Sequence, residues 1–295
     1  MNFRTTLTLV FVFTSILSIA QDTSEQFIFI GHPYGWHTGG EKVDPRLEIL
    51  DFTDYERIWL GGDVCSEAML EYDIISYIDS LFNISKPENT WALGNHDARN
   101  YNWEFYREIA GKKTFNVHSK NKVTVITLNT NITPADCEKL NDQYRLITTV
   151  CDTIQSSTDL ILIMHHGIWL DVPGLPSPST YAQSNLIFWN SNCYDVNSTF
   201  VNSIYPLLLD VKEKGINVTC LIGDMGANGK TFSKYSDDSI LFLGCGLNNS
   251  LYTDSTELAN QPKDKVLIFE HNITTNTLEW EFQDLDSLIV TQQKY

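Results

Sequence analysis

Basic residues are scarce in this chain of 295 residues. It has 20 lysines and arginines against 37 aspartates and glutamates, a formal net charge of −17 at pH 7. No basic run and no stripe of alternating basic and aromatic residues occurs. Nucleic-acid binding depends on lysine and arginine neutralising phosphates, so the composition argues against a nucleic-acid partner. The acidic excess favours solubility instead.

Long hydrophobic runs are absent after the first 20 residues. Within that segment Arg4 precedes an apolar run from Leu7 to Leu17, and Ser18-Ile19-Ala20 follows as a cleavage site. This order is typical of a secretory signal peptide, and the run is too short and wrongly flanked to span a membrane. We therefore expect a signal peptide at 1–20, a secreted or periplasmic mature protein and no membrane span.

Repeats, low-complexity segments and linkers are also missing. Residues 21–295 are therefore predicted to form a single domain, which is long enough to bury a substantial core. No sequence feature indicates an oligomeric state.

Six cysteines occur, and an even number in an exported chain permits disulfides. Cys137 and Cys151 flank a helix-like stretch at 138–149 and are the pair that we predict. Cys65 lies two residues after Asp63. It is either a soft metal ligand or, as we favour, a packed cysteine.

Strand-like and helix-like patterns alternate along the chain, which predicts an α/β fold with a largely parallel sheet covered by helices. Two late apolar runs, 266–270 and 278–282, bracket a turn as a hairpin and are expected to belong to the second sheet of a sandwich. The other predicted strands are 26–30, 57–60, 90–93, 122–128, 160–164, 217–222 and 239–244. The predicted helices are 46–52, 68–81, 103–109, 138–149 and 200–213.

Three of these strands end in residues that can bind metals. A Gly-Asp pair ends at Asp63, a Gly-Asn-His-Asp run ends at Asp97, and a His-His pair begins at His165. Ligands bind at the carboxyl ends of strands in open α/β sheets. Carboxylate, amide and imidazole donors together suit Zn, Fe or Mn better than Ca.

The order Gly-Asp, Gly-Asn-His-Asp, His-His resembles that of the calcineurin-like metallophosphoesterase superfamily, over roughly residues 27–282. Gly-Asn-His-Asp after a strand is the specific part of the pattern, whereas the two pairs alone are weak signals. The resemblance implies a two-sheet β-sandwich flanked by helices. It also implies hydrolysis of small phosphoesters by metal-activated water, with a divalent transition metal (Zn, Fe or Mn) in one firm site and a weaker second site.

The resemblance implies the metal ligands by position, with the carboxylate of Asp63 as the bridge. The first turn departs from the family pattern, because His32-x-Tyr34 stands where Asp-x-His is expected. The last turn also departs, because Asp224-x-Gly226 stands where His-x-His is expected. The weaker site has lost its donor at Gly226. The predicted ligand set is His32, Asp63, Asn95, His165 and Asp224.

Further histidines differ in their expected roles. His96 would assist the leaving group as a general acid or hydrogen-bond donor. Asp97 would orient the ring of His96 or, equally well, cap the following helix. His166 is expected to position the substrate or the ligands. His118 and His271 lie away from strand tips and are expected at the surface.

Residues 170–198 follow the His-His turn as an irregular stretch, which predicts either a lid over the site or a disulfide-pinned surface loop. Two main functional hypotheses follow from the sequence, and hydrolysis of some other bond at a mononuclear metal site is a weaker third. We favour a secreted metal-dependent hydrolase, because Asn95, His96 and His165 are retained together. The alternative is a non-catalytic secreted binding protein, which the altered ligands at both ends of the pattern support.

Overall fold

The computed structural model describes residues 24–66, 68–99, 102–180, 189–225, 230–252 and 254–293. The signal peptide predicted at 1–20 lies outside these residues. No helix among them has the length and apolar character needed to cross a membrane.

The first of two mixed sheets has the strand order β11-β10-β1-β2-β3. Strands β1, β2 and β3 run parallel, whereas β10 is antiparallel to both β1 and β11. The strands are β1 (Ser24–Ile30), β2 (Arg57–Leu60), β3 (Thr90–Trp91), β10 (Lys265–Asn272) and β11 (Thr277–Asp284).

The second sheet has the order β4-β5-β6-β7-β9-β8. Its four central strands are parallel, and the edge strands β4 and β8 are antiparallel to their neighbours. The strands are β4 (Asn116–Lys120), β5 (Val123–Thr127), β6 (Asp159–Met164), β7 (Asn217–Ile222), β8 (Thr231–Tyr235) and β9 (Leu241–Cys245).

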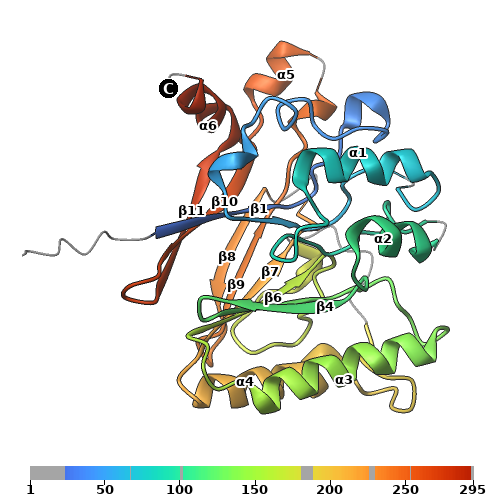
Figure 1. Ribbon diagram of the computed structural model, residues 1–295, viewed down its shortest axis with the longest axis vertical. Helices are drawn as coiled ribbons and strands as arrows, with labels where there is room; N and C mark the ends of the chain where they lie inside the picture. The colour runs from blue at the N-terminus through green and yellow to red at the C-terminus, as the bar shows by residue number, and fades with distance from the viewer. Residues whose placement is uncertain are drawn as a thin grey trace, which may run out of the picture.

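Helices cover the outer faces of the two sheets (Figure 1). The first sheet packs against α1 (Tyr72–Phe82), α2 (Trp103–Ala110) and α6 (Leu285–Gln292). The second packs against α3 (Cys137–Thr153) and α4 (Tyr205–Glu213), which follows a π-helical turn at Phe200–Ile204. The short helix α5 (Ser255–Ala259) lies between β9 and β10. The predicted α/β fold, a two-sheet sandwich flanked by helices, is thus confirmed.

The period-2 alternation of strand side chains produces these layers. In β1, Phe27 and Phe29 face the other sheet, while Ile28 and Ile30 face the helices. Strand β6 alternates in the same way and is buried at every position. Because both faces of the central strands are covered, these strands carry mostly apolar or β-branched residues on both faces rather than alternating apolar and polar residues.

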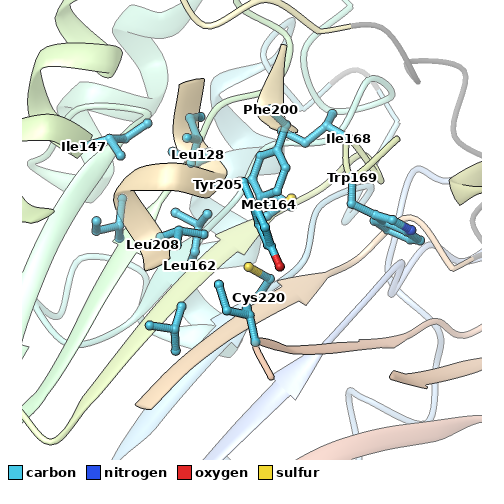
Figure 2. Packing of buried hydrophobic residues seen from close by; sticks show 14 of the residues in the cluster. Leu128, Ile147, Leu162, Met164, Ile168, Trp169, Phe200, Tyr205, Leu208 and Cys220 are labelled. Carbon is cyan, nitrogen blue, oxygen red and sulfur yellow. The ribbon is translucent and has the colours of Figure 1, made fainter. Parts of the chain in front are cut away.

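Figure 2 shows the helix-covered face of the second sheet. Leu208 of α4 and Ile147 of α3 belong to the same buried cluster as Leu162 of β6 and Cys220 of β7. Burying such a leucine or isoleucine contributes about 1.5–3 kcal/mol, so this layer anchors the strands whose tips carry the site.

The late hairpin does not lie where the sequence analysis put it. Strands β10 and β11 extend the first sheet, because β10 pairs with the edge of β1 that β2 leaves open. The second sheet instead comes entirely from the middle of the chain. A hairpin of this kind can pair with the open edge of either sheet, and the hydrophobic pattern of the sequence does not determine which sheet it joins.

Two predicted helices also differ from the structure. Residues 46–50 form turns followed by a 3-10 turn at Phe52–Asp54 rather than a helix. The helix predicted at 68–81 begins only at Tyr72. Before it, the backbone N–H of Met69 donates to the Asp97 carbonyl at 3.1 Å, so this segment is held by the next loop instead of by helical hydrogen bonds.

The predicted Cys137–Cys151 disulfide is wrong, and Cys137 is bonded to Cys193. Cys137 and Cys151 both lie within α3, and 14 residues of helix separate their Cα atoms by about 21 Å, far beyond the reach of a disulfide. The Cα atoms of Cys137 and Cys193 are 5.5 Å apart. Cys65 and Cys151 are buried free cysteines, as are Cys220 and Cys245.

His271, expected at the surface, is fully buried. It follows Leu267 and Phe269 along β10 at intervals of two, so its side chain takes the face that these residues direct toward the second sheet. His118 on the edge strand β4 is only half-buried.

Candidate metal centre

Two glycines allow the two sheets to touch at their strand tips. Gly61 follows β2 in the first sheet, and Gly223 follows β7 in the second. A Cβ atom on Gly223 would lie 1.8 Å from the Gly61 carbonyl oxygen, so any side chain there would push the backbones apart. This approach brings Asp63 and Asp224 together although they belong to different sheets.

Asp63, His165 and Asp224 form a buried triad at this meeting point. One ligand atom from each lies within 4.8 Å of the others, which is close enough to hold one metal ion. The exposed fractions of the residues are 2%, 0% and 7%. Carboxylates and an imidazole form a donor set suited to a divalent transition metal.

The imidazole of His165 is oriented for this role. Its Nδ1 donates to the Gly61 carbonyl at 2.7 Å. Its Nε2 lies 3.4 Å from Asp63 Oδ2 and has no hydrogen-bond partner. A histidine whose other nitrogen donates to a backbone carbonyl is the usual arrangement of a metal ligand, because that bond fixes the tautomer and the ring. The orphaned Nε2 therefore fits the proposed ion.

The field around the triad favours a cation. Burial lowers the pKa of His165, yet the carboxylates of Asp63 and Asp224 outweigh it and raise that pKa to about 10. Burial likewise opposes ionisation of Asp63, but the imidazoles of His165 and His32 hold its pKa well below the usual range. A site that keeps an imidazole charged attracts a metal ion for the same electrostatic reason.

His32 approaches the same carboxylate oxygen of Asp63 as His165 does. Its Nε2 is 3.5 Å from Asp63 Oδ2, its Nδ1 has no hydrogen-bond partner, and the residue is 5% exposed. Both residues have left-handed backbones, with φ of 48° at His32 and 52° at Asp63. Such strain in non-glycine residues persists only where the surrounding structure enforces it, and it is concentrated at functional sites.

In the described part of the chain, neither Tyr34 nor Asn95 has a hydrogen bond to Asp63, His165 or Asp224. The Tyr34 hydroxyl donates to the Gly39 carbonyl at 2.6 Å, and its ring packs edge-on against His96. Asn95 is half-buried on the turn between Gly94 and His96. Gly226, the predicted missing donor, lies outside the described residues.

Asp97 accepts five hydrogen bonds. Four come from the backbone N–H groups of Asp63, Val64, Cys65 and Gly94, at 2.7 to 3.1 Å, and the fifth comes from the indole of Trp91 at 3.2 Å. The fully buried carboxylate thus joins the loop after β2 to the loop after β3. It holds the backbone that carries Asp63, and its own hydrogen bonds go to these groups rather than to the ring of His96.

His96 stands beside the triad at the edge of the solvent. Its backbone N–H donates to Asp63 Oδ1 at 2.9 Å, and its ring is half-buried. Its Nδ1 lies 2.8 Å from Nη2 of Arg99. Burial lowers the pKa of His96, with the positive charge of Arg99 adding to the effect and the carboxylate of Asp63 opposing it.

His166 supports the ring of His165. The two imidazoles pack edge to face with centroids 4.7 Å apart. Its Nδ1 lies 2.6 Å from the hydroxyl of Thr130. Burial, together with the neighbouring His165, lowers the pKa of His166 to about 3, so this ring is neutral.

The stretch predicted as a lid is described in part, because 181–188 lie outside the described residues. Cys193 is bonded to Cys137 of α3, and the indole of buried Trp189 donates to the Ile132 carbonyl at 3.2 Å. The described part after residue 188 is therefore pinned to the α3 side of the second sheet. Its role over the site stays a prediction.

Sequence reasoning found the triad but missed two contacting residues, Arg99 and Thr130. Neither stands in a strand-end motif that would have singled it out. No protein-family model matches the chain, and no curated protein matches it either.

Proposed function

We propose that the protein is a secreted, metal-dependent hydrolase of small phosphoesters, of the calcineurin-like metallophosphoesterase type. The observation that carries the proposal is the buried Asp63, His165 and Asp224 triad with the half-buried ring of His96 beside it. The Gly-Asn-His-Asp sequence at 94–97 and the Cys137–Cys193 disulfide, which suits an oxidising compartment, add support.

The triad would hold the ion through Asp63, Asp224 and Nε2 of His165, with Asn95 as a further oxygen donor on the adjacent turn. A bound Zn, Fe or Mn ion lowers the pKa of water from ~16 toward ~7 and polarises a phosphoryl oxygen. His32, which also lies beside Asp63, would be the remaining donor of a weaker second position.

The chain's own residues would supply orientation and hydrogen bonding. The N–H of His96 and the clamp of Asp97 keep the Asp63 carboxylate in place. His96, half-buried beside the triad, would face the leaving-group oxygen. His166, whose ring packs edge to face on that of His165, would hold that ring in position.

The first experiment is metal analysis of the purified mature protein, with hydrolysis of para-nitrophenyl phosphate followed in parallel. We expect about one to two tightly bound transition-metal ions and turnover. Asp63→Ala should lose the metal. His96→Ala should keep it and lose about 10²- to 10⁴-fold in kcat. Bound metal with an unchanged rate in His96→Ala would remove His96 from the mechanism.

One observation favours a second candidate, a non-catalytic binding protein. Tyr34 stands where the family pattern has a histidine, but its hydroxyl donates a hydrogen bond to the Gly39 carbonyl. The second metal position therefore has few donors. No bound metal and no turnover, after Zn, Fe and Mn are each offered back, would select this candidate and reject the hydrolase.

A further inference from the structure

Arg99 is an exposed residue on the turn after Asp97, and it contacts the ring of His96. Nη2 of Arg99 lies 2.8 Å from Nδ1 of His96. A guanidinium has five N–H donors, no acceptor, and a charge that persists at all ordinary pH values. In this hydrogen bond Nδ1 must therefore accept, and the single ring proton of the neutral imidazole lies on Nε2.

Among the described residues, no carboxylate is hydrogen-bonded to the ring of His96. The carboxylate of Asp97 accepts hydrogen bonds from five N–H donors, none of them on the ring of His96. Asp63 Oδ1 accepts from the backbone N–H of His96 rather than from its side chain. A carboxylate partner would stabilise a doubly protonated ring. The guanidinium does the opposite, because an N–H at Nδ1 would face another donor and a like charge.

We infer that Arg99 is a positioning residue that fixes His96 in the Nε2–H form, and that it thereby restricts the enzyme to phosphoesters with stable leaving groups. The inference rests on the proposed function. Aryl and enol phosphates and phosphoanhydrides have leaving groups of this kind, whereas simple alkyl phosphates do not.

The chemistry behind this restriction is a hydrogen bond without proton transfer. A neutral imidazole that gave up its Nε2 proton would become an imidazolate, a strongly basic anion, so the Nε2–H form of His96 donates a hydrogen bond rather than its proton. As the water oxygen bonds to phosphorus, the P–O bond to the leaving group breaks, and the leaving oxygen keeps the electron pair. Nε2–H donates a hydrogen bond to this oxygen. The oxygen takes its proton from solvent, which also receives the proton lost by the attacking water.

Substrate comparison is the first test. In the metal-loaded wild type, kcat should fall steeply from para-nitrophenyl phosphate to phenyl phosphate, and glycerol phosphate should be hydrolysed most slowly. Similar rates for all three esters would show that His96 protonates the leaving group fully, and would overturn the restriction.

Variants of Arg99 test the positioning role. Arg99→Ala should lower kcat for para-nitrophenyl phosphate by about 10- to 100-fold with little change in KM, as for other residues that orient a catalytic group. Arg99→Gln keeps an N–H donor for Nδ1 and should recover part of the loss. The matched control is Arg107→Ala, because Arg107 is an exposed arginine of α2 paired with Glu104. Equal losses in Arg107→Ala and Arg99→Ala would overturn the role.

Nitrogen NMR of labelled histidine separates this inference from the proposed function, because the metal-free protein suffices. With His96 assigned from the spectrum of His96→Ala, the wild type should show an unprotonated Nδ1 and a protonated Nε2. Arg99→Ala should shift His96 toward a mixture of tautomers. A protonated Nδ1 in the wild type would overturn the inference even if the enzyme were active. Absence of metal and turnover would overturn only the hydrolase and the substrate restriction.

Discussion

Asp97 contributes to the site through the backbone rather than through chemistry. Its carboxylate lies between two loops and accepts N–H groups from both, including that of Asp63. A buried carboxylate is costly unless its lone pairs are filled, and here they are filled by donors that otherwise would have no partner. Asp97, the last residue of the Gly-Asn-His-Asp run, therefore holds the loop after β2, which carries Asp63, in place.

Asp97→Asn should destabilise the fold and weaken the metal site together. The amide turns one acceptor into a donor that faces backbone N–H groups, so about 3 kcal/mol of the free energy of unfolding should be lost. Urea denaturation and metal titration measure the two effects. Asp142→Asn, at a partly exposed partner of Arg145 on α3, is the control and should cost less than about 1 kcal/mol. Full metal affinity in Asp97→Asn would contradict the fastening role.

At this scale, sequence alone placed three of the residues that meet at the site. Asp63, His165 and Asp224 each follow a strand. Parallel pairing of β6 and β7 brings His165 and Asp224 to one edge, whereas Asp63 comes from the other sheet, and the sequence pattern did not show the contact between the sheets. The partner of His96 was not predictable. It depends on how the turn after Asp97 directs an exposed arginine, which no periodic pattern encodes.

Among the elements, the tips of β2 and β7 determine whether the triad forms. Gly61 and Gly223 pack backbone against backbone, and the Nδ1 bond of His165 to the Gly61 carbonyl locks the same junction. The absence of two side chains is thus what lets residues of separate sheets share one site.

Gly223→Ala should separate these tips. A Cβ at 1.8 Å from the Gly61 carbonyl oxygen cannot be accommodated without backbone movement, which should cost about 2 kcal/mol and reduce metal affinity. Gly111→Ala at the end of α2 is the control. It has open space but a φ of 65°, so it should cost about 1 kcal/mol and leave metal affinity unchanged. Calorimetry measures the stability of both variants, and metal titration measures their metal affinity. Wild-type metal affinity in Gly223→Ala would disprove the packing argument.

The disulfide links α3 to the loop before α4 across a sequence separation of 56 residues. Closing a loop of this length lowers the entropy of the unfolded chain, so the Cys137→Ser, Cys193→Ser double variant should lose about 2–4 kcal/mol. Thiol titration of the unfolded, unreduced wild type should find the four cysteines that are free in the structure. Six reactive thiols would refute the bond, and two would show a second disulfide among the cysteines that are free in the structure.

Secondary structure was easiest to predict where both faces of an element are buried. Strand β7 matches its predicted bounds, 217–222, because five of its six residues are buried and are apolar or β-branched, a composition that favours a strand. The edge strands β4 and β8 were missed, since they are partly exposed and carry polar residues at most positions. The sheet to which β10 and β11 belong was also beyond prediction, because it depends on which edge is left open.

Over the whole molecule, the proposed metal centre lies where the two sheets are joined, so the proposed function and the stability of the fold depend on the same residues. The chain carries a net charge of −17, and its triad buries two carboxylates where the sheets join. Without a metal ion, the charged imidazole of His165 offsets only part of the mutual repulsion of these carboxylates, which opposes closure of the junction. A bound ion would remove this repulsion and connect the two sheets directly.

Metal removal should therefore lower the stability of the entire fold rather than of one loop. An ion that binds only the folded state adds RT ln(1 + [L]/Kd), about 2.7 kcal/mol when the free metal is at 100 times Kd. Thermal unfolding with and without a chelator measures this, and zinc added back should restore the original Tm. Asp63→Ala, which lacks the shared ligand, should show the same Tm in chelator and in zinc. A metal-dependent Tm in Asp63→Ala would mean that the stabilising ion binds elsewhere, because the triad cannot hold it without the carboxylate that connects His165 with Asp224.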